Sequence, residues 1–141
     1  MSDLISPDLA SQLKGAPDDV KLRAAEILDQ IKEAKKKEDA RDSFMGFVQY
    51  MWPAFIEGRH HKIMAEAFEK IARGELKRLI INMPPRHTKS EFASYLFPAW
   101  LMGRNPNTKV IQATHTAELA VGFGRKVKNL IDSEIYRDIF P

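Results

Sequence analysis

The segment that most constrains how this chain can fold is residues 79–90, with the sequence LIINMPPRHTKS. It begins with an apolar, β-branched run, continues through two prolines and ends in Lys89 and Ser90. An uninterrupted apolar run is typical of a strand that is covered on both faces. The order of strand, loop and helix predicts a phosphate-binding loop in which Met83 and Thr88 occupy the two glycine positions.

Phosphate binding depends on inward-facing N–H groups, a lysine and a hydroxyl more than on a fixed pattern of letters. Lys89 is expected to neutralise the β- and γ-phosphates, and Ser90 to ligate the Mg²⁺ that accompanies the nucleotide. Arg86 could reach the γ-phosphate and stabilise charge during transfer, which makes it the candidate catalytic residue. The alternative is that Arg86 and Lys89 are ordinary loop cations. The expected cofactors are ATP and Mg²⁺, bound by Pro85, Arg86, His87, Thr88, Lys89 and Ser90.

Composition sets the limits of this interpretation. The 141 residues suit one ordinary domain, and the absence of cysteine excludes disulfides and thiolate metal sites. No apolar run is long enough to span a membrane. Residues 1–43 hold eight basic and ten acidic residues, whereas residues 44–141 hold fourteen basic and nine acidic ones. The basic part therefore coincides with the loop, and polyanion binding is plausible there.

Local signals predict a first helix that starts at residue 18 and runs out in the charged, solvated stretch 35–39, and further helices over residues 44–52, 59–73, 89–97 and 116–132. Ser43 should cap the second of these, Gly74 should end the third, and Pro98 should kink or break the fourth. Residues 79–81 and 109–114 are the two predicted strands. The apolar residues of 135–141 are expected to be buried.

The predicted fold class is α/β, the N-terminal portion of a P-loop (RecA-like) NTPase sheet preceded by a helical segment. In this division, residues 1–43 form an acidic helical segment. Residues 44–141 form the first part of the ATPase domain, with the Walker A loop at 83–90. Two parallel strands do not make a stable sheet, so the domain is expected to be incomplete.

The loop and its surroundings resemble a known family. Residues 80–91 look like the Walker A segment of the large subunit of tailed-bacteriophage DNA-packaging terminases, which typically reads Pro-Pro-Arg-His-Gly-Lys-Ser. The resemblance covers roughly residues 44–141, and its other segments are 61–70, 74–79, 97–100, 103–106 and 136–141. The main departure is Thr88, where the family usually has glycine. Because a β-branched residue resists positive φ, we expect Thr88 to be helical or extended and able to cap the next helix.

The resemblance implies an ATP-driven motor and nuclease that packages viral DNA into a procapsid in the cytoplasm of the bacterial host. The nuclease domain of that family would lie outside this chain. The implied partners are double-stranded viral DNA, the small terminase subunit, the portal protein of the procapsid and further copies in a ring, with no membrane. The region around Trp52, His60 and His61 lies where such motors often build an adenine pocket, although the two histidines are expected to be surface or packing residues. Thr114 to Thr116 correspond to a segment suited to coupling or DNA contact.

Hydrolysis needs a second acidic motif at the end of a later strand, and none follows Ser90. The sequence therefore predicts an N-terminal fragment of a terminase large subunit that supplies the nucleotide-binding loop and does not hydrolyse ATP efficiently alone. Unpaired strand edges should also make it partly unfolded or prone to aggregation.

Two alternatives stay open. One is a fragment of a helicase-like P-loop ATPase. The other is a non-catalytic module that binds DNA or a capsid partner, for which Arg125, Lys126 and Lys128 on the last long helix are candidates. The same three cations also suit an ordinary solvated helix face.

Overall fold

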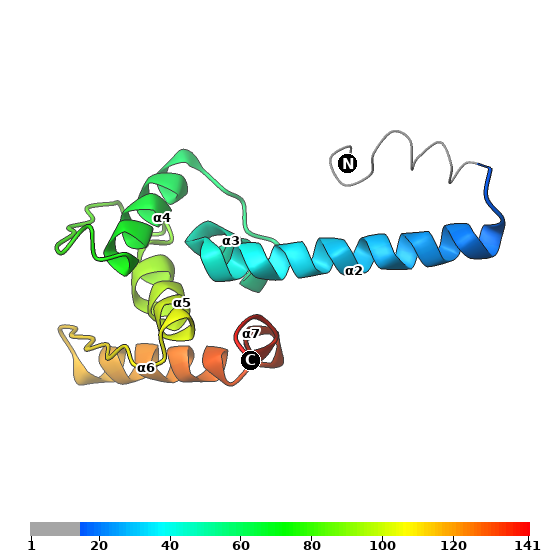
Figure 1. Ribbon diagram of the computed structural model, residues 1–141. Coiled ribbons are helices and arrows are strands. Elements are labelled where there is room, and N and C mark those ends of the chain that lie inside the picture. The colour runs from blue at the N-terminus through cyan, green and yellow to red at the C-terminus, as the bar shows by residue number, and fades with distance from the viewer. Residues whose placement is uncertain (1–14) are drawn as a thin grey trace. The chain divides into compact units, whose positions relative to one another are not determined.

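The computed structural model describes residues 15–141, which divide between two compact units with a boundary after Lys36. None of the described helices is long and apolar enough to cross a membrane. The elements, in chain order, are α2 (Asp18–Asp42), α3 (Phe44–Met51), α4 (Arg59–Ala72), the π-helix η1 (Glu91–Leu96), α5 (Phe97–Arg104), α6 (Ala117–Ile131) and α7 (Glu134–Ile139) (Figure 1).

The α/β prediction is wrong, because residues 15–141 contain helices and no strand. The two segments predicted as strands, 79–81 and 109–114, have no regular secondary structure. A strand exists only through its hydrogen-bonded neighbour, and neither segment has one. Ile80 is 85% exposed and Ile111 is 96% exposed, so these apolar runs are not covered on both faces. The fold of the described chain is all-α, without a RecA-like sheet.

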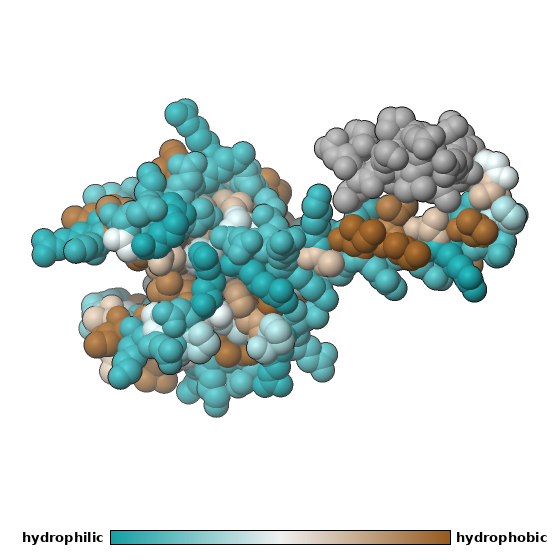
Figure 2. All heavy atoms as spheres, in the orientation of Figure 1, coloured by the Kyte–Doolittle hydropathy of each residue, from teal (hydrophilic) through white to brown (hydrophobic). Residues whose placement is uncertain are grey.

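The part of α2 that belongs to the first unit, up to Lys36, is stabilised by local interactions. Ion pairs three residues apart join Lys21 to Asp18 at 3.3 Å and Lys32 to Asp29 at 2.9 Å. The apolar stripe that predicted this helix is exposed at Val20 and Ile27 (Figure 2). Exposed ion pairs contribute less than about 1 kcal/mol each. The helical periodicity of α2 is therefore real, but it does not mark a buried face within this unit.

The second unit is built around the ring of Phe44, which is fully buried. The rings of Phe68, Phe92 and Phe97 meet it edge-on with centroids 5.4, 5.5 and 5.7 Å away. The ring of Trp100 lies 5.5 Å from it at a tilt. Edge-to-face contacts of this kind add to the gain from burying the rings. The core thus joins α3, α4, η1 and α5 directly beside the loop at 83–90.

Helix ends in this unit follow the local signals in the sequence. The Ser43 hydroxyl accepts a hydrogen bond from the Gly46 N–H at 3.1 Å, which caps α3. Gly74 follows α4 with a φ of 77°, a left-handed conformation that favours glycine. Thr116 caps α6 by accepting from the Leu119 N–H. The predicted cap at Ser43, the helix end at Gly74 and the start of a helix at Thr116 are confirmed.

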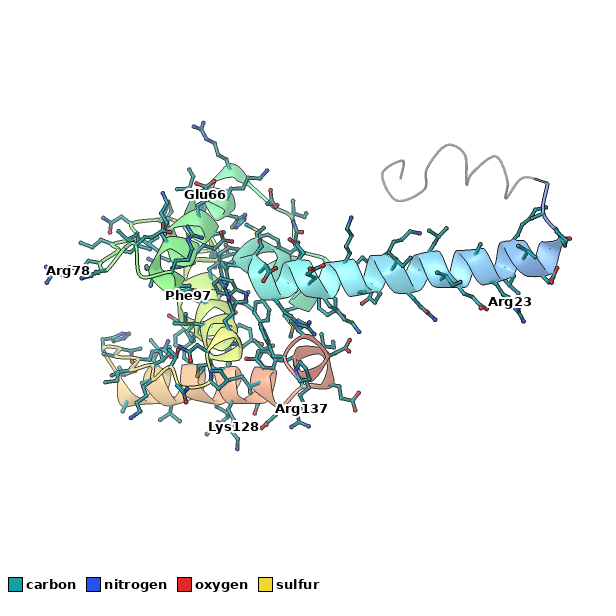
Figure 3. The ribbon with its side chains drawn as sticks, viewed as in Figure 1. Arg23, Glu66, Arg78, Phe97, Lys128 and Arg137 are labelled. Carbon is teal, nitrogen blue, oxygen red and sulfur yellow. The ribbon has the colours of Figure 1, made fainter. Side chains whose placement is uncertain are left out.

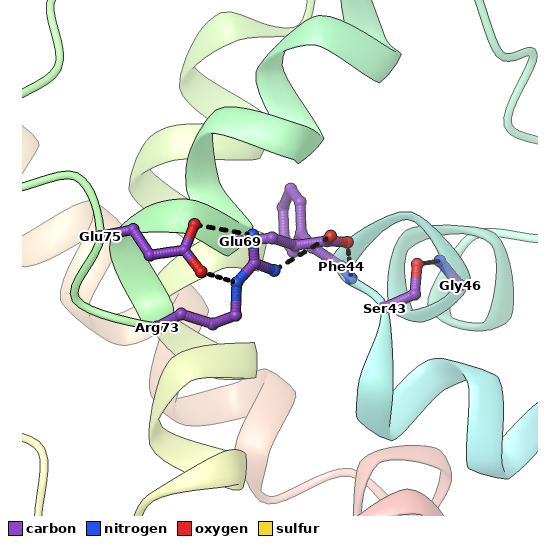
Figure 4. A network of polar contacts seen from close by, with 6 residues as sticks. All are labelled: Ser43, Phe44, Gly46, Glu69, Arg73 and Glu75. Atoms are coloured by element: carbon purple, nitrogen blue, oxygen red, sulfur yellow. Dashed lines mark hydrogen bonds and ion pairs between the residues drawn. The ribbon is translucent and has the colours of Figure 1, made fainter.

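Helix α3 is joined to α4 by a polar contact at its first residue. The Phe44 N–H donates to Glu69 of α4 at 2.9 Å, and Glu69 lies 3.9 Å from Arg73 (Figure 4). Arg73 in turn forms a closer pair with Glu75 at 2.7 Å. A carboxylate at a helix N-terminus satisfies a free donor and interacts well with the helix dipole. Glu69 therefore fixes the start of α3 from another element.

A π-helical turn separates the loop from α5. The Phe97 N–H donates to the carbonyl of Phe92, five residues earlier. Since Pro98 has no N–H, it cannot donate to the carbonyl of Ser94, and the Gln112 side chain donates to that carbonyl instead, at 3.2 Å. The π geometry ends at Leu96 and α geometry begins at Phe97, so the break at Pro98, one of the two predicted outcomes, does not occur.

The C-terminal residues return to the core, as predicted. Tyr136 and Ile139 are buried, and the Tyr136 hydroxyl donates to the Ala99 carbonyl at 2.8 Å. Burial raises the pKa of Tyr136 to about 12. On the outer side of α7, the Lys37 ammonium donates to Asp138 at 2.8 Å and holds the pKa of that carboxyl below its ordinary value. The C-terminal residues are thus held in the second unit both by burial and by polar contacts.

Candidate phosphate-binding loop

The loop at residues 83–90 connects the extended segment after α4 to the helical stretch that contains η1. The helix begins at Lys89, and its first main-chain bond runs from the Phe92 N–H to the Thr88 carbonyl at 2.9 Å. Lys89 and Ser90 therefore occupy the first helical positions. The helix dipole places partial positive charge at this point. The sequence-predicted site residues are thus brought to a helix N-terminus, although residues 15–82 contain no strand before them.

The backbone of the loop alternates in hand. Arg86 has a φ of 66° and Thr88 has a φ of 56°, while His87 between them is not in the left-handed region. The expectation that Thr88 is helical or extended is therefore wrong. Its side chain does not cap the helix either, because the hydrogen bonds of its hydroxyl join it to the His87 carbonyl at 2.7 Å and to the His61 ring, and not to a backbone N–H of the helix. A left-handed residue beside one of ordinary hand turns successive N–H groups toward one side, which creates an anion-binding concavity.

The donors of this loop are free of internal acceptors. Within residues 15–141, no acceptor pairs with the backbone N–H groups of residues 86–91. Pro85 supplies no donor, as expected, and its carbonyl lies 2.9 Å from Nδ1 of the His87 ring. Phosphate groups often bind at helix N-termini, where unpaired N–H groups can donate to their oxygens. The free N–H groups of this loop are therefore available to an anion.

The cations of the loop also lack counter-charges. Neither Arg86 nor Lys89 forms an ion pair with an acidic group of the described chain, and Lys89 is half-buried. The nearest acid in sequence, Glu91, lies 3.4 Å from Lys126 of α6 instead. Ser90 is exposed at the helix start. The loop therefore presents two uncompensated cations and one hydroxyl.

No metal site of protein ligands accompanies the loop. Residues 15–141 contain no group of three or more His, Asp or Glu side chains that could hold a metal ion. Ser90 thus remains the candidate metal contact, through a nucleotide-bound Mg²⁺. The hydroxyl alone supplies one oxygen, so a Mg²⁺ held here would depend on phosphate oxygens and water for its other ligands.

A histidine that the sequence pattern marks only as a surface or packing residue is part of this site. His61 of α4 is only 6% exposed, and its Nε2 lies 2.7 Å from the Thr88 hydroxyl. The ring centroids of His60 and His61 are 3.8 Å apart. Trp52, which is 39% exposed, reaches His61 only through Phe55, whose ring lies 5.4 Å from that of Trp52 and 4.7 Å from that of His61. The sequence gives little sign of this contact, because residues 61 and 88 are far apart along the chain.

Of the basic residues of α6, Lys126 has contacts with other side chains. Lys126 pairs with Glu91 and lies over the rings of Tyr95 and Phe123 at 5.9 and 5.8 Å. Lys128 points away from the unit (Figure 3). These contacts agree with a solvated face.

The segment from Thr114 to Thr116, expected to serve coupling or DNA contact, is bonded within its own turn. The Thr114 hydroxyl donates to the Thr116 carbonyl at 2.6 Å. The Thr116 hydroxyl accepts from the Leu119 N–H. Both hydroxyls therefore shape the start of α6.

Comparison with known proteins adds no relative: no family model, curated protein or solved structure matches this chain.

Proposed function

We propose that residues 83–90 bind the phosphates of Mg·ATP, and that the chain serves as the nucleotide-binding part of a DNA-packaging terminase large subunit. The proposal rests on the loop and its sequence resemblance, and does not require a sheet beneath it.

The roles of the side chains follow from their places. Lys89, at the helix start, is the contact for the β- and γ-phosphates, and Ser90 is the contact for Mg²⁺. Arg86 reaches from the exposed turn toward the γ-phosphate. Pro85, His87 and Thr88 shape the loop, and the N–H groups of residues 86–90 bind the phosphate oxygens.

The observation that carries the proposal is the left-handed backbone at Arg86 and Thr88. Non-glycine residues avoid this region at a cost of about 1–2 kcal/mol each. Such strain persists where the surrounding structure imposes it, and it is concentrated at functional sites. Thr88 takes a glycine-like conformation at the position where the resembled family has glycine. The left-handed backbone at this position therefore supports the proposal that the loop binds phosphate.

Hydrolysis by this chain alone is not part of the proposal. The acidic residues after Ser90 are Glu91, Glu118, Asp132, Glu134 and Asp138. Three of them are paired with cations: Glu91 with Lys126, Asp132 with Arg137, and Asp138 with Lys37. All five lie on helices or in a turn of the described chain, and none follows a strand, where the metal-binding and water-activating acid of phosphoryl transfer is expected. Nucleotide binding without efficient turnover is therefore the proposed activity.

The wider setting is proposed from the resemblance alone. The partners would be double-stranded viral DNA, a small terminase subunit, the portal protein of a procapsid and further copies in a ring, within the cytoplasm of a bacterial host.

Calorimetric titration with Mg·ATPγS tests the binding site. We expect binding by the unmodified protein and a loss of at least about tenfold in affinity for Lys89→Ala, because a charge-assisted contact to phosphate is removed. Lys128→Ala removes the same charge from the exposed face of α6 and is the matched control, with affinity unchanged. Absence of any binding, or equal effects of the two substitutions, would contradict the proposal.

A further inference from the structure

His61 links the first turn of α4 to the phosphate loop through a continuous set of hydrogen bonds. The Gly58 N–H donates to Nδ1 of His61 at 2.9 Å. Nε2 of the same ring lies 2.7 Å from the Thr88 hydroxyl. That hydroxyl donates in turn to the His87 carbonyl at 2.7 Å. Elements 27 residues apart in sequence are thus joined through one imidazole.

The directions of these bonds fix the tautomer of the ring. A backbone N–H can only donate, so Nδ1 of His61 must be unprotonated. The neutral ring then carries its proton on Nε2 and donates to Thr88. The Thr88 hydroxyl then donates its own proton to the His87 carbonyl. Each of the three donors, the Gly58 N–H, the His61 ring and the Thr88 hydroxyl, therefore has one acceptor. A second proton on the ring would place an N–H at Nδ1 against the Gly58 N–H.

The surroundings of the ring favour this neutral form. His61 packs against the rings of Phe55 and Phe92, with centroids 4.7 and 5.2 Å away. The ionisable groups that act on it are His60 of α4, Glu57 of the preceding turn and His87 of the loop. Burial is the largest influence and lowers the pKa of His61, His60 and His87 lower it further, and Glu57 opposes them.

The bond ends on the residue whose backbone is strained. Thr88 adopts a φ of 56°, which a β-branched residue rarely adopts unaided. A glycine at this position would need no support, but it could not accept a hydrogen bond from His61. The presence of threonine in place of glycine therefore creates the need for support and also supplies the hydroxyl through which His61 can provide it.

We propose that His61 is a positioning residue of the phosphate loop, and that its neutral ring holds the Thr88 hydroxyl so that Thr88 keeps its left-handed backbone. The importance of this contact for nucleotide binding rests on the function proposed above, whereas its effect on the loop backbone does not.

NMR of the nucleotide-free protein tests the backbone part. We expect long-range ¹H–¹⁵N spectra to show the His61 proton on Nε2, and Thr88 to show left-handed backbone shifts. On acidification, the Thr88 shifts should change with the same midpoint as the His61 ring. His60→Gln, which alters the neighbouring ring, is the control that leaves the Thr88 conformation in place. A proton on Nδ1, or a Thr88 conformation that is the same in His61→Gln, would overturn the proposal.

Substitutions at Thr88 test the link without disturbing α4. Thr88→Val keeps the β-branch and removes the hydroxyl, so Mg·ATPγS affinity should fall about five- to tenfold. Thr88→Ser keeps the hydroxyl and should bind like the unmodified protein. Thr88→Gly should bind well without His61, so adding His61→Gln should change its affinity by less than about twofold.

Two results separate this inference from the proposed function. If His61→Gln weakens binding as much in the Thr88→Gly variant as in the unmodified protein, His61 does not act through Thr88, and the inference fails while nucleotide binding stands. If the unmodified protein shows the expected tautomer and Thr88 conformation but binds no nucleotide, the proposed function fails and the positioning role of His61 stands.

Discussion

Thr88 and His61 show how a strained residue in a loop can depend on a side chain from another helix. At Thr88 the backbone takes a conformation that suits glycine, and the side chain that makes it costly also supplies the hydroxyl that secures it. His61, a neutral ring inside an aromatic cluster, is the other half of the contact. A change at either residue should therefore alter the loop backbone, although the sequence of the loop alone gives no sign that His61 matters.

The same ring predicts how stability depends on pH. The pKa of His61 is lowered in the folded state, mainly by burial, so the unfolded chain takes up the proton at higher pH than the folded one. This contribution to stability is complete above about pH 6.5, the ordinary histidine pKa, and is lost as the pH falls through the lowered value. We expect the urea midpoint to be lower at about pH 5.5 than at about pH 7.5.

His61→Gln should remove most of that difference. His115→Gln, at an exposed position before α6, is the matched control and should leave it unchanged. A pH dependence that persists in His61→Gln would assign the effect to other groups.

Among the elements, α3 depends on a partner from another helix. Because Glu69 of α4 accepts the Phe44 N–H, Glu69→Ala should destabilise the protein by about 1–3 kcal/mol. Glu69→Gln keeps an acceptor oxygen and loses only the long ion pair to Arg73, so it should cost less than about 1 kcal/mol. Glu66→Ala, on the exposed face of the same helix (Figure 3), should be neutral. Equal losses for the two Glu69 variants in urea unfolding would show that charge, and not the hydrogen bond, matters here.

The helix ends could be predicted from sequence and the strands could not, for a physical reason. Ser43, Gly74 and Thr116 act on donors and acceptors a few residues away, so their chemistry is local. A strand at 79–81 or 109–114 requires a distant partner, and an apolar run looks the same whether or not that partner exists. Residues 85–90 can be proposed as a phosphate-binding loop from the sequence, because a lysine followed by a hydroxyl residue at a helix start is a pattern that such loops use. His61 cannot be assigned to the site in this way, because only the tertiary fold brings it to Thr88.

At the scale of the whole molecule, the two extended segments leave apolar side chains exposed. The sequence predicts aggregation through unpaired strand edges. The described residues contain no strand, so that reason does not apply to them. Ile80 and Ile111 are nevertheless almost fully exposed. Exposed apolar residues in extended segments are an aggregation hazard. We expect Ile80→Thr and Ile111→Thr to reduce light scattering on heating and to change stability by less than about 0.5 kcal/mol.

The same substitution at a buried position supplies the contrast. Ile139→Thr, in the core contact of α7, should lower the melting temperature clearly. If the two exposed substitutions also lowered it, the segments would have to be packed against other parts of the chain.

The loop that gathers N–H donors and two cations without internal acceptors has a thermodynamic consequence. A ligand that binds the native chain and not the unfolded one shifts the folding equilibrium by mass action, by about 2.7 kcal/mol at a concentration of about 100 times its dissociation constant. If phosphate esters occupy the loop, the folded population of this protein is set partly by their concentration in the surrounding solution. The persistence of the chain against unfolding and proteolysis then becomes a function of nucleotide supply as well as of its own core.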